Sequence, residues 1–391
     1  MATTTQPPVA GSKPAHPFYR AEHDEWRAVL RRWVAREIEP NVDAWERACG
    51  FPRDLYRKAA EVGLLQLGFP EAYGGVPADI FMQTVSTEEL CRPAAGGVYA
   101  SLMSHAIGAP PIAAHGSDEL KRRVLSPILA GEKISALAIT EPSGGSDVAR
   151  LQTTARREGD HYVVNGSKAF ITSGMRADCY TVAVRTGGDG IAGISLLLIE
   201  RETPGFTRTP IEKMGWHASD TATLYFDDAR VPAANLIGAE NAGFLAIMHN
   251  FNGERMGLST MALATAQAAY DEALAYARER ETFGKPLVKH QVIRHKFVEM
   301  ARQLNAARAY RDAVAWRIAG GESPVADVCL VKVQATTALE FCAREAAQIL
   351  GGASYQRGTK IERIYREVRV LAIGGGSEEV MRDLAARQLG L

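Results

Sequence analysis

The sequence has no excess of charge of either sign, since its 391 residues include 45 lysines and arginines and 45 aspartates and glutamates. A balanced chain lacks the broad basic field that draws proteins to nucleic acid or to anionic membranes. It also lacks any apolar run near the roughly 20 residues that a membrane-spanning helix needs. We therefore expect no nucleic-acid partner and no membrane. An anionic ligand would have to be held by local arginines and backbone N–H groups.

Cysteine is scarce, and its spacing argues against the usual cysteine-based sites. The five cysteines are scattered without a CxxC pair, and the nine histidines form no HExxH motif. A disulfide framework or a zinc site is therefore not expected, and free thiols fit a reducing cytoplasm. Residues 1–17 lack the apolar core of a secretion signal. We expect a disordered tail there and a cytoplasmic protein.

Three segments with different patterns of apolar residues follow one another along the chain. Residues 18–134 carry apolar side chains at helical spacing, and the first helix is expected to end before Pro40. Residues 135–240 contain alternating and apolar runs typical of strands. Residues 241–391 return to long helices rich in alanine and arginine, with the length of bundle helices. The sequence therefore predicts a mainly α protein with a β domain in its middle, rather than the alternation of a Rossmann sheet.

Two local patterns in the middle segment make specific predictions. In HYVVNGSKAFITSG, residues 161–174, the pair Asn165-Gly166 lies between two strand-like runs and predicts a hairpin turn. GDGIAG, residues 188–193, matches the dinucleotide-binding pattern G-x-G-x-x-G. A strand follows it, however, where that motif needs a helix, so we interpret it as a hairpin loop.

A third pattern, AITEPSGGSDVA at residues 138–149, has more than one interpretation. Its hydroxyl side chains can bond a ligand, and its paired glycines let backbone amides approach one closely. Such a loop could bind a planar cofactor and a pyrophosphate. It could equally be a polar turn at the surface, and composition alone favours the turn.

This stretch resembles the first signature of the acyl-CoA dehydrogenases, a family of flavoproteins. Further blocks are similar to that family at the expected distances, namely AFITSG (169–174), EKMGWHASDTATLYFDDARVP (212–232), RETFGKPLVKHQ (280–291), QILGG (348–352) and IERIYREVRV (361–370). The resemblance covers nearly the whole chain after residue 18. It implies an N-terminal helical domain, a middle β-barrel-like domain and a C-terminal four-helix bundle. One departure is Arg150, where the signature usually has a small residue, and we do not expect it to abolish cofactor binding.

The resemblance implies FAD as the cofactor. Thr140, Gly145 and Ser146 resemble flavin or thioester contacts, and Phe170 and Thr172 resemble the pair that packs against the flavin ring. The dinucleotide half is expected to contact Arg280, Phe283, Gln291, Gln348, Gly351 and Gly352, and Ser377 and Glu379 are expected near the flavin. Arg280 and Gln348 alone would be ordinary helix-surface residues, and only their joint spacing suggests a site. Because the family takes several of these groups from a neighbouring subunit, a homotetramer built as a dimer of dimers is implied.

Dehydrogenation of an acyl-CoA needs a base for the Cα proton and a hydride acceptor for Cβ. Many family members carry the base as a Glu near the C-terminus, but Gly375 occupies that position here and can transfer no proton. Glu254 instead resembles the base of a subgroup that includes the isovaleryl-CoA and long-chain enzymes. Considered alone, Glu254 could simply stabilise a helix N-terminus. Arg255 resembles an arginine that meets CoA, and the N–H of Gly375, with Ser146, could still contact the thioester.

The resemblance thus implies α,β-dehydrogenation of an acyl-CoA in fatty acid β-oxidation, with electrons passed to an electron-transferring flavoprotein. The same fold could also serve an oxidase, a flavin monooxygenase or a dehydrogenase of carrier-bound aminoacyl groups. A flavin-binding protein that has lost its base is a further alternative. The acyl group is undetermined, but residues 96–111 are expected to hold the pocket floor, where Tyr99, Leu102, Met103 and Ser104 could limit its depth.

Overall fold

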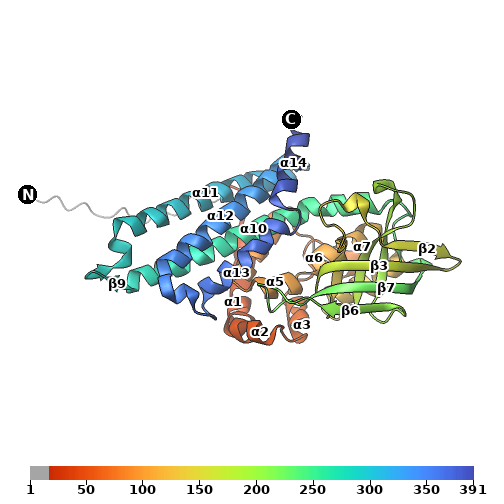
Figure 1. Ribbon diagram of the computed structural model, residues 1–391, viewed down its shortest axis with the longest axis horizontal. Coiled ribbons are helices and arrows are strands. Elements are labelled where there is room, and N and C mark those ends of the chain that lie inside the picture. The colour runs from red at the N-terminus through yellow and green to blue at the C-terminus, as the bar shows by residue number, and fades with distance from the viewer. Residues whose placement is uncertain (1–16) are drawn as a thin grey trace, which may run out of the picture.

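The computed structural model describes residues 17–391, so the tail expected at residues 1–17 lies outside the described residues except for its last position. The described chain forms helices, then a sheet, then long helices (Figure 1). The predicted mainly α fold with a middle β domain is therefore confirmed. No helix in residues 17–391 is both long and apolar enough to cross a membrane.

The N-terminal segment is a set of short helices around α1. They are α1 (Ala21–Glu37), α2 (Val42–Ala48), α3 (Asp54–Glu61), α4 (Ile80–Cys91), α5 (Gly96–Leu102), α6 (His105–Gly108), α7 (Pro110–His115), α8 (Asp118–Leu120) and α9 (Ser126–Leu129). The apolar face of α1 buries Leu30, Trp33 and Val34, and the helix ends before Pro40 as predicted. Pro40 lies in a short 3₁₀ turn, because its ring cannot continue the α-helical hydrogen bonding.

The middle segment is one sheet. Its strands are β1 (Ser135–Ala138), β2 (Thr154–Glu158), β3 (His161–Thr172), β4 (Cys179–Arg185), β5 (Ile194–Glu200), β6 (Phe206–Pro210), β7 (Thr221–Pro232) and β8 (Leu236–Ile237). The order β6-β7-β3-β2-β4-β5-β8, with β1 parallel to β4, leaves the sheet open instead of closed into a barrel. Residues 188–193 join β4 to antiparallel β5, as predicted for a hairpin loop.

The prediction of a hairpin turn at Asn165-Gly166 is wrong. β3 passes through both residues without a break, and the turn that joins it to β2 lies at Gly159-Asp160. Asn165 and Gly166 instead lie at an irregularity in the pairing of β3 with β7. A Cβ on Gly166 would lie 2.8 Å from the Cα of Thr153. The glycine is therefore required for close backbone approach at a bulge, as glycines inside strands often are.

The C-terminal segment is a helical bundle built on α10 (Gly243–Glu279), with α11 (Gln291–Ala319), α12 (Val325–Leu350), α13 (Lys360–Ile373) and α14 (Glu378–Gln388). α10 has 37 residues, which makes it about 55 Å long at roughly 1.5 Å per residue. It begins beside the sheet and ends at the small hairpin β9 (Glu281–Thr282) and β10 (Lys285–Pro286), at the opposite end of the molecule (Figure 1). Its buried face is rich in alanine, which lets α12 pack closely along it.

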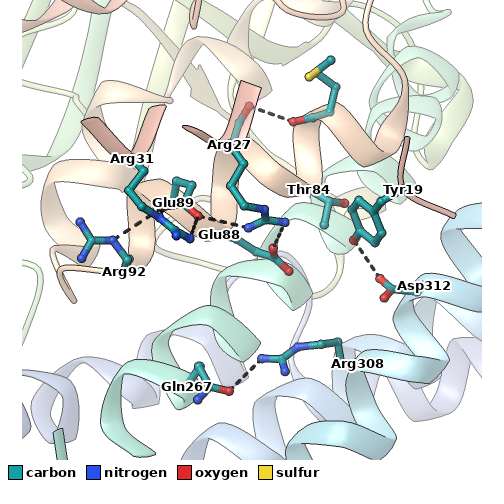
Figure 2. A network of polar contacts seen from close by, with 12 residues as sticks. Tyr19, Arg27, Arg31, Thr84, Glu88, Glu89, Arg92, Gln267, Arg308 and Asp312 are labelled. Atoms are coloured by element: carbon teal, nitrogen blue, oxygen red, sulfur yellow. Dashed lines mark hydrogen bonds and ion pairs between the residues drawn. The ribbon is translucent and has the colours of Figure 1, made fainter. Parts of the chain in front are cut away.

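A buried polar network fixes the N-terminal helices to this bundle (Figure 2). Arg27 on α1 binds Glu88 and Glu89 on α4, with N–O distances of 2.7 and 3.2 Å. Arg311 on α11 binds the same Glu88 at 2.8 Å. Burial alone would raise the pKa of Glu88, but Arg311 and Arg27 hold it below its usual range. Since removing one partner of such a buried pair is costly, the three helices are held in one relative position.

Candidate active site

Glu254 and Gly375 are far apart in the sequence but lie next to each other in the structure. Glu254 is on α10, and Gly375 is in the turn that leads from α13 to α14. A Cβ placed on Gly375 would come within 3.7 Å of Glu254 Oε1 and 2.3 Å of Leu258 Cδ1. The Glu254 carboxylate therefore lies where a side chain at position 375 would enter. Leu258, one turn further along α10, fills the adjoining space.

The position of Glu254 within α10 excludes its interpretation as a helix-terminus carboxylate. The helix begins at Gly243, so Glu254 lies about three turns inside it. The favourable interaction of an acidic side chain with a helix N-terminus falls off within the first turn. The carboxylate must therefore be explained by its surroundings in the tertiary structure.

Those surroundings give Glu254 the acid–base properties of a proton acceptor near neutral pH. Within the described chain, Glu254 Oε2 has almost no accessible surface and no hydrogen-bond partner. Burial raises the pKa of the carboxyl to about 7, although the positive charges of Arg255 and Lys332 oppose that rise. An unpartnered buried carboxyl that titrates near neutrality is typical of a general base.

Two cationic side chains hold the turn that contains Gly375. The Arg255 Nε donates to the Gly375 carbonyl oxygen at 3.4 Å, and its guanidinium lies 5.4 Å from the ring centre of Phe251. Lys332 Nζ on α12 donates to the carbonyl oxygen of Gly376. Arg255 is only 7% exposed. The Arg255 guanidinium thus bonds the turn in this structure, and the CoA contact expected for it stays a prediction.

The flavin residues expected in the β domain lie on two adjoining segments, the loop after β1 and the end of β3. Thr140, Gly145 and Ser146 lie in the loop after β1, and the N–H of Ala169 on β3 donates to the Thr140 carbonyl oxygen at 2.9 Å. Phe170, next along β3, is 67% exposed and has φ +59°. A non-glycine residue at such a φ is strained, and strain of this kind clusters at functional sites.

A buried ion pair fixes that loop to β3. Lys168 Nζ donates to Glu141 Oε1 at 2.8 Å and to the Ile139 carbonyl oxygen at 3.1 Å. Glu141 also accepts the N–H groups of Gln152 and Thr153. Burial lowers the pKa of Lys168 to about 8. The pair therefore joins the loop that contains Thr140 to β3. On β3, Phe170 and the half-buried Thr172 follow Lys168 by two and four residues. An exposed aromatic side chain beside the hydroxyl groups of this loop fits a planar flavin ring.

The residues expected to bind the dinucleotide half lie at the other end of the bundle. Arg280, Phe283 and Gln291 surround the β9–β10 hairpin, and Gln348, Gly351 and Gly352 close α12. The ion pair of Lys296 with Glu345 shows that the start of α11 and the end of α12 are adjacent. All six residues are exposed, and Phe283 is 98% exposed with φ +52°.

These distal residues do not meet the flavin residues within one chain. Arg280 lies about 40 Å along α10 from Glu254, at roughly 1.5 Å per residue, and the sheet is at the opposite end (Figure 1). Ser377 and Glu379, by contrast, begin α14 directly after the Gly375 turn. The Ser377 hydroxyl accepts the N–H of Val380 as a helix cap, and the backbone and Ser377 lower the pKa of the exposed Glu379.

Of the four residues expected at the pocket floor, only Tyr99 adjoins the bundle. Tyr99 packs against both the main core and the bundle core that Leu258 contacts, and its hydroxyl lies 3.2 Å from Thr87 Oγ1. Leu102 is fully buried in the main core, Met103 packs against it, and Ser104 donates to the Ser135 carbonyl oxygen. Of these four residues, Tyr99 is therefore the one that lies between the N-terminal helices and the bundle.

Sequence reasoning missed Lys332 and Leu258. A lysine within the apolar run DVCLVKVQA was an available signal, because a lysine is almost never fully buried unless it is paired. Leu258 follows Glu254 by four residues, so both occupy one face of α10. Neither pattern indicates by itself that both residues meet the Gly375 turn.

Comparisons with known proteins agree with this architecture. Models of the acyl-CoA dehydrogenase N-terminal, middle and C-terminal domains match residues 20–132, 136–229 and 241–390. A probable acyl-CoA dehydrogenase of Bacillus subtilis is 35% identical over 368 residues, which cover 93% of this chain and 96% of that protein. The crystal structure of a probable acyl-CoA dehydrogenase from Mycobacterium abscessus is 50% identical, with a TM-score of 0.94 over 95% of this chain and 100% of that one.

A further similar structure bears on the cofactor. It is a glutaryl-CoA dehydrogenase from Mycobacterium smegmatis in complex with FADH2, 26% identical, with a TM-score of 0.90 over 96% of both chains.

Proposed function

Since the chain belongs to the acyl-CoA dehydrogenase family, a family of FAD-dependent oxidoreductases, we propose that it desaturates an acyl-CoA thioester to the trans-2-enoyl-CoA. In this proposal Glu254 removes the Cα proton. The observation that carries it is the half-buried Glu254 beside Gly375, whose Oε2 is buried without a hydrogen-bond partner in the described chain. Gly374, Gly375 and Gly376 offer no side chain, and the carboxylate that a Cβ at position 375 would meet in the described chain is that of Glu254 on α10.

The side chains of this protein set up the proton transfer. Bound FAD supplies a hydride acceptor for the substrate Cβ. Glu254 accepts the Cα proton, and its raised pKa matches it to a weakly acidic C–H group near neutral pH. The backbone N–H of Gly375, with Ser146, donates to the thioester carbonyl as negative charge develops on its oxygen. Phe170 and Thr172 pack and bond against the flavin ring, next to the loop of Thr140 and Gly145.

We propose that Arg280, Phe283, Gln291, Gln348, Gly351 and Gly352 bind the dinucleotide half of an FAD whose flavin lies in a neighbouring subunit. The support is their separation from the flavin residues and the near-complete exposure of Phe283. Such an arrangement needs at least a dimer, and a homotetramer built from two such dimers is the form we propose. An electron-transferring flavoprotein is proposed as the acceptor. The cytoplasm is proposed as the compartment, since all five cysteines are free thiols.

The test is anaerobic reduction of the flavin by a panel of straight, branched and aromatic acyl-CoAs. The parent protein should be bleached by at least one member of the panel. Glu254→Gln should still bind FAD and acyl-CoA but be reduced at least ~10²-fold more slowly, as expected for loss of a general base. The matched control is Glu272→Gln, the same change at a partly exposed position of α10, which should behave as the parent.

The possible results separate this proposal from its alternatives. Unchanged bleaching of Glu254→Gln would refute the base, and no bleaching of the parent by any acyl-CoA would refute the dehydrogenase. Rapid peroxide formation in air would indicate an oxidase. Bleaching only by acyl groups on a phosphopantetheinyl carrier protein would indicate a carrier-linked enzyme.

A further inference from the structure

Lys332 is a buried cation without an acidic partner within hydrogen-bond distance. Its side chain is 0% exposed, and among residues 17–391 no salt bridge to it is found. The nearby Glu378 is already engaged, because it accepts from Thr336 at 2.7 Å and from Arg382 at 2.9 Å. An unpaired buried charge is costly. Lys332 therefore lowers the stability of the fold, and this cost points to a role in the site beside it, which contains Glu254 and the Gly375 turn.

The contacts of Lys332 identify that site. Its Nζ donates to the Gly376 carbonyl oxygen, while Arg255 donates to the carbonyl oxygen of Gly375. Two cations, one from α12 and one from α10, therefore bind consecutive carbonyls of a single turn. Gly375 and Gly376 have φ values of +67° and +103°, a conformation that glycine adopts freely but does not by itself hold. The hydrogen bonds from Arg255 and Lys332 therefore hold the backbone of this turn in one conformation.

Lys332 also acts on Glu254 through charge. The charged and titratable groups around the carboxylate are Arg255 on its own helix and Lys332 on α12, with Cys329 and Glu378 beside Lys332. Burial raises the pKa of Glu254, and the positive charge of Lys332 opposes that rise. Burial likewise lowers the pKa of Lys332 itself to about 8, so the amine is still protonated at neutral pH.

We propose that Lys332 is a positioning residue of this site, which holds the Gly375–Gly376 turn against Glu254 and keeps the carboxylate in its proton-accepting form. Lys332 does not contact the reacting atoms in this role. It acts through the turn and through the charge of Glu254. The inference rests on the proposed function, because it assigns Lys332 to the base of that reaction.

The first test is the pH profile of single-turnover flavin reduction in the FAD-loaded enzyme. The rate should rise with pH as Glu254 loses its proton. In Lys332→Met the rising limb should move to higher pH, since a nearby opposite charge lowers a carboxyl pKa. Lys332→Arg, which keeps the charge, should return the limb to the parental position. Lys360→Met, a lysine change at the far end of α13, serves as the control.

An FAD-loaded Lys332→Met whose rising limb coincides with that of the parent would overturn the proposal, even if its rate were lower at every pH. A uniform loss of that kind would mark an ordinary structural residue. The proposal would equally fail if the limb stayed displaced in Lys332→Arg.

A second experiment measures the charge interaction between Lys332 and Glu254 without catalysis. The loss of thermal stability between pH 5.5 and pH 8 should be larger in Lys332→Met than in the parent. This difference should become smaller when Glu254→Gln is added to both, because only the titration of Lys332 itself then remains. A difference of undiminished size in the Glu254→Gln background would overturn the coupling. If no acyl-CoA bleaches the parent, the proposed function fails, while this cycle still reports on Lys332 and Glu254.

Discussion

Moving the base from position 254 to position 375 should fail in this protein unless Leu258 is also made smaller. The starting variant is Glu254→Gln, to which Gly375→Glu is added. Gly375 has φ +67°, where a side chain costs about 1–2 kcal/mol. Its Cβ would lie 2.3 Å from Leu258 Cδ1, far inside the roughly 3.5–4.0 Å of normal carbon contact. Displacing Leu258 adds about 1–3 kcal/mol.

A combined cost of about 3 kcal/mol lowers the population of the intact turn by roughly a hundredfold, at 1.4 kcal/mol per factor of ten. The assay is single-turnover flavin reduction by the best acyl-CoA of the panel. Glu254→Gln with Gly375→Glu should be as slow as Glu254→Gln alone. Adding Leu258→Ala should speed reduction at least tenfold, because the new side chain then has room. Glu254→Gln with Leu258→Ala is the control and should gain nothing. Parental rates without the Leu258 change would refute the reasoning.

Two further predictions concern a buried carboxyl and the flavin face. Burial and the nearby Glu46 raise the pKa of Glu367 to about 8, against an ordinary value of 4.5. The folded state thus binds more protons between these values, and stability should fall by up to about 5 kcal/mol as pH rises through this range. Glu367→Gln should flatten the thermal midpoints measured from pH 5.5 to 8.5, and a Gln variant less stable than the parent at pH 8.5 would contradict the assignment. Phe170→Ala should weaken FAD binding about tenfold, for loss of roughly 1 kcal/mol or more of aromatic contact, as measured by fluorescence titration of the apoprotein. Ile191→Ala, which changes an exposed apolar residue in a loop of the same sheet, should leave FAD binding unchanged. Equal losses of FAD affinity in the two variants would argue against a flavin contact at Phe170.

Local periodicity was enough to predict the order of helices and strands, because burial of one face imposes its own spacing on each element. It was not enough for the β2–β3 turn. Asn165-Gly166 carries the local signal of a turn, yet a bulge against a distant strand calls for the same glycine. Which of the two forms is decided by pairing with β7, about sixty residues further along the chain, and no local pattern contains that information.

The candidate site shows the same division. The positions of Glu254 and Gly375 could be matched to a family pattern, and the structure places their side chain and backbone together. The contact of Arg255 with the Gly375 carbonyl oxygen could not be predicted, because a sequence does not reveal that a guanidinium is turned inward onto a carbonyl group. Lys332 was missed because its partner, Gly376, lies on another element and offers only a backbone oxygen.

The length of α10 has a genetic consequence if the proposed assembly holds. One rigid helix then supplies the base of the catalytic centre in its own subunit. About 40 Å away, it ends at the residues that bind the FAD of the neighbouring subunit. A subunit without Glu254 and a subunit without Arg280 and Phe283 would each be inactive alone. Mixed in one dimer, they would rebuild one complete centre from their intact halves. Two defective alleles of this kind would complement each other, whereas a single change that bent the helix would damage both centres and act dominantly.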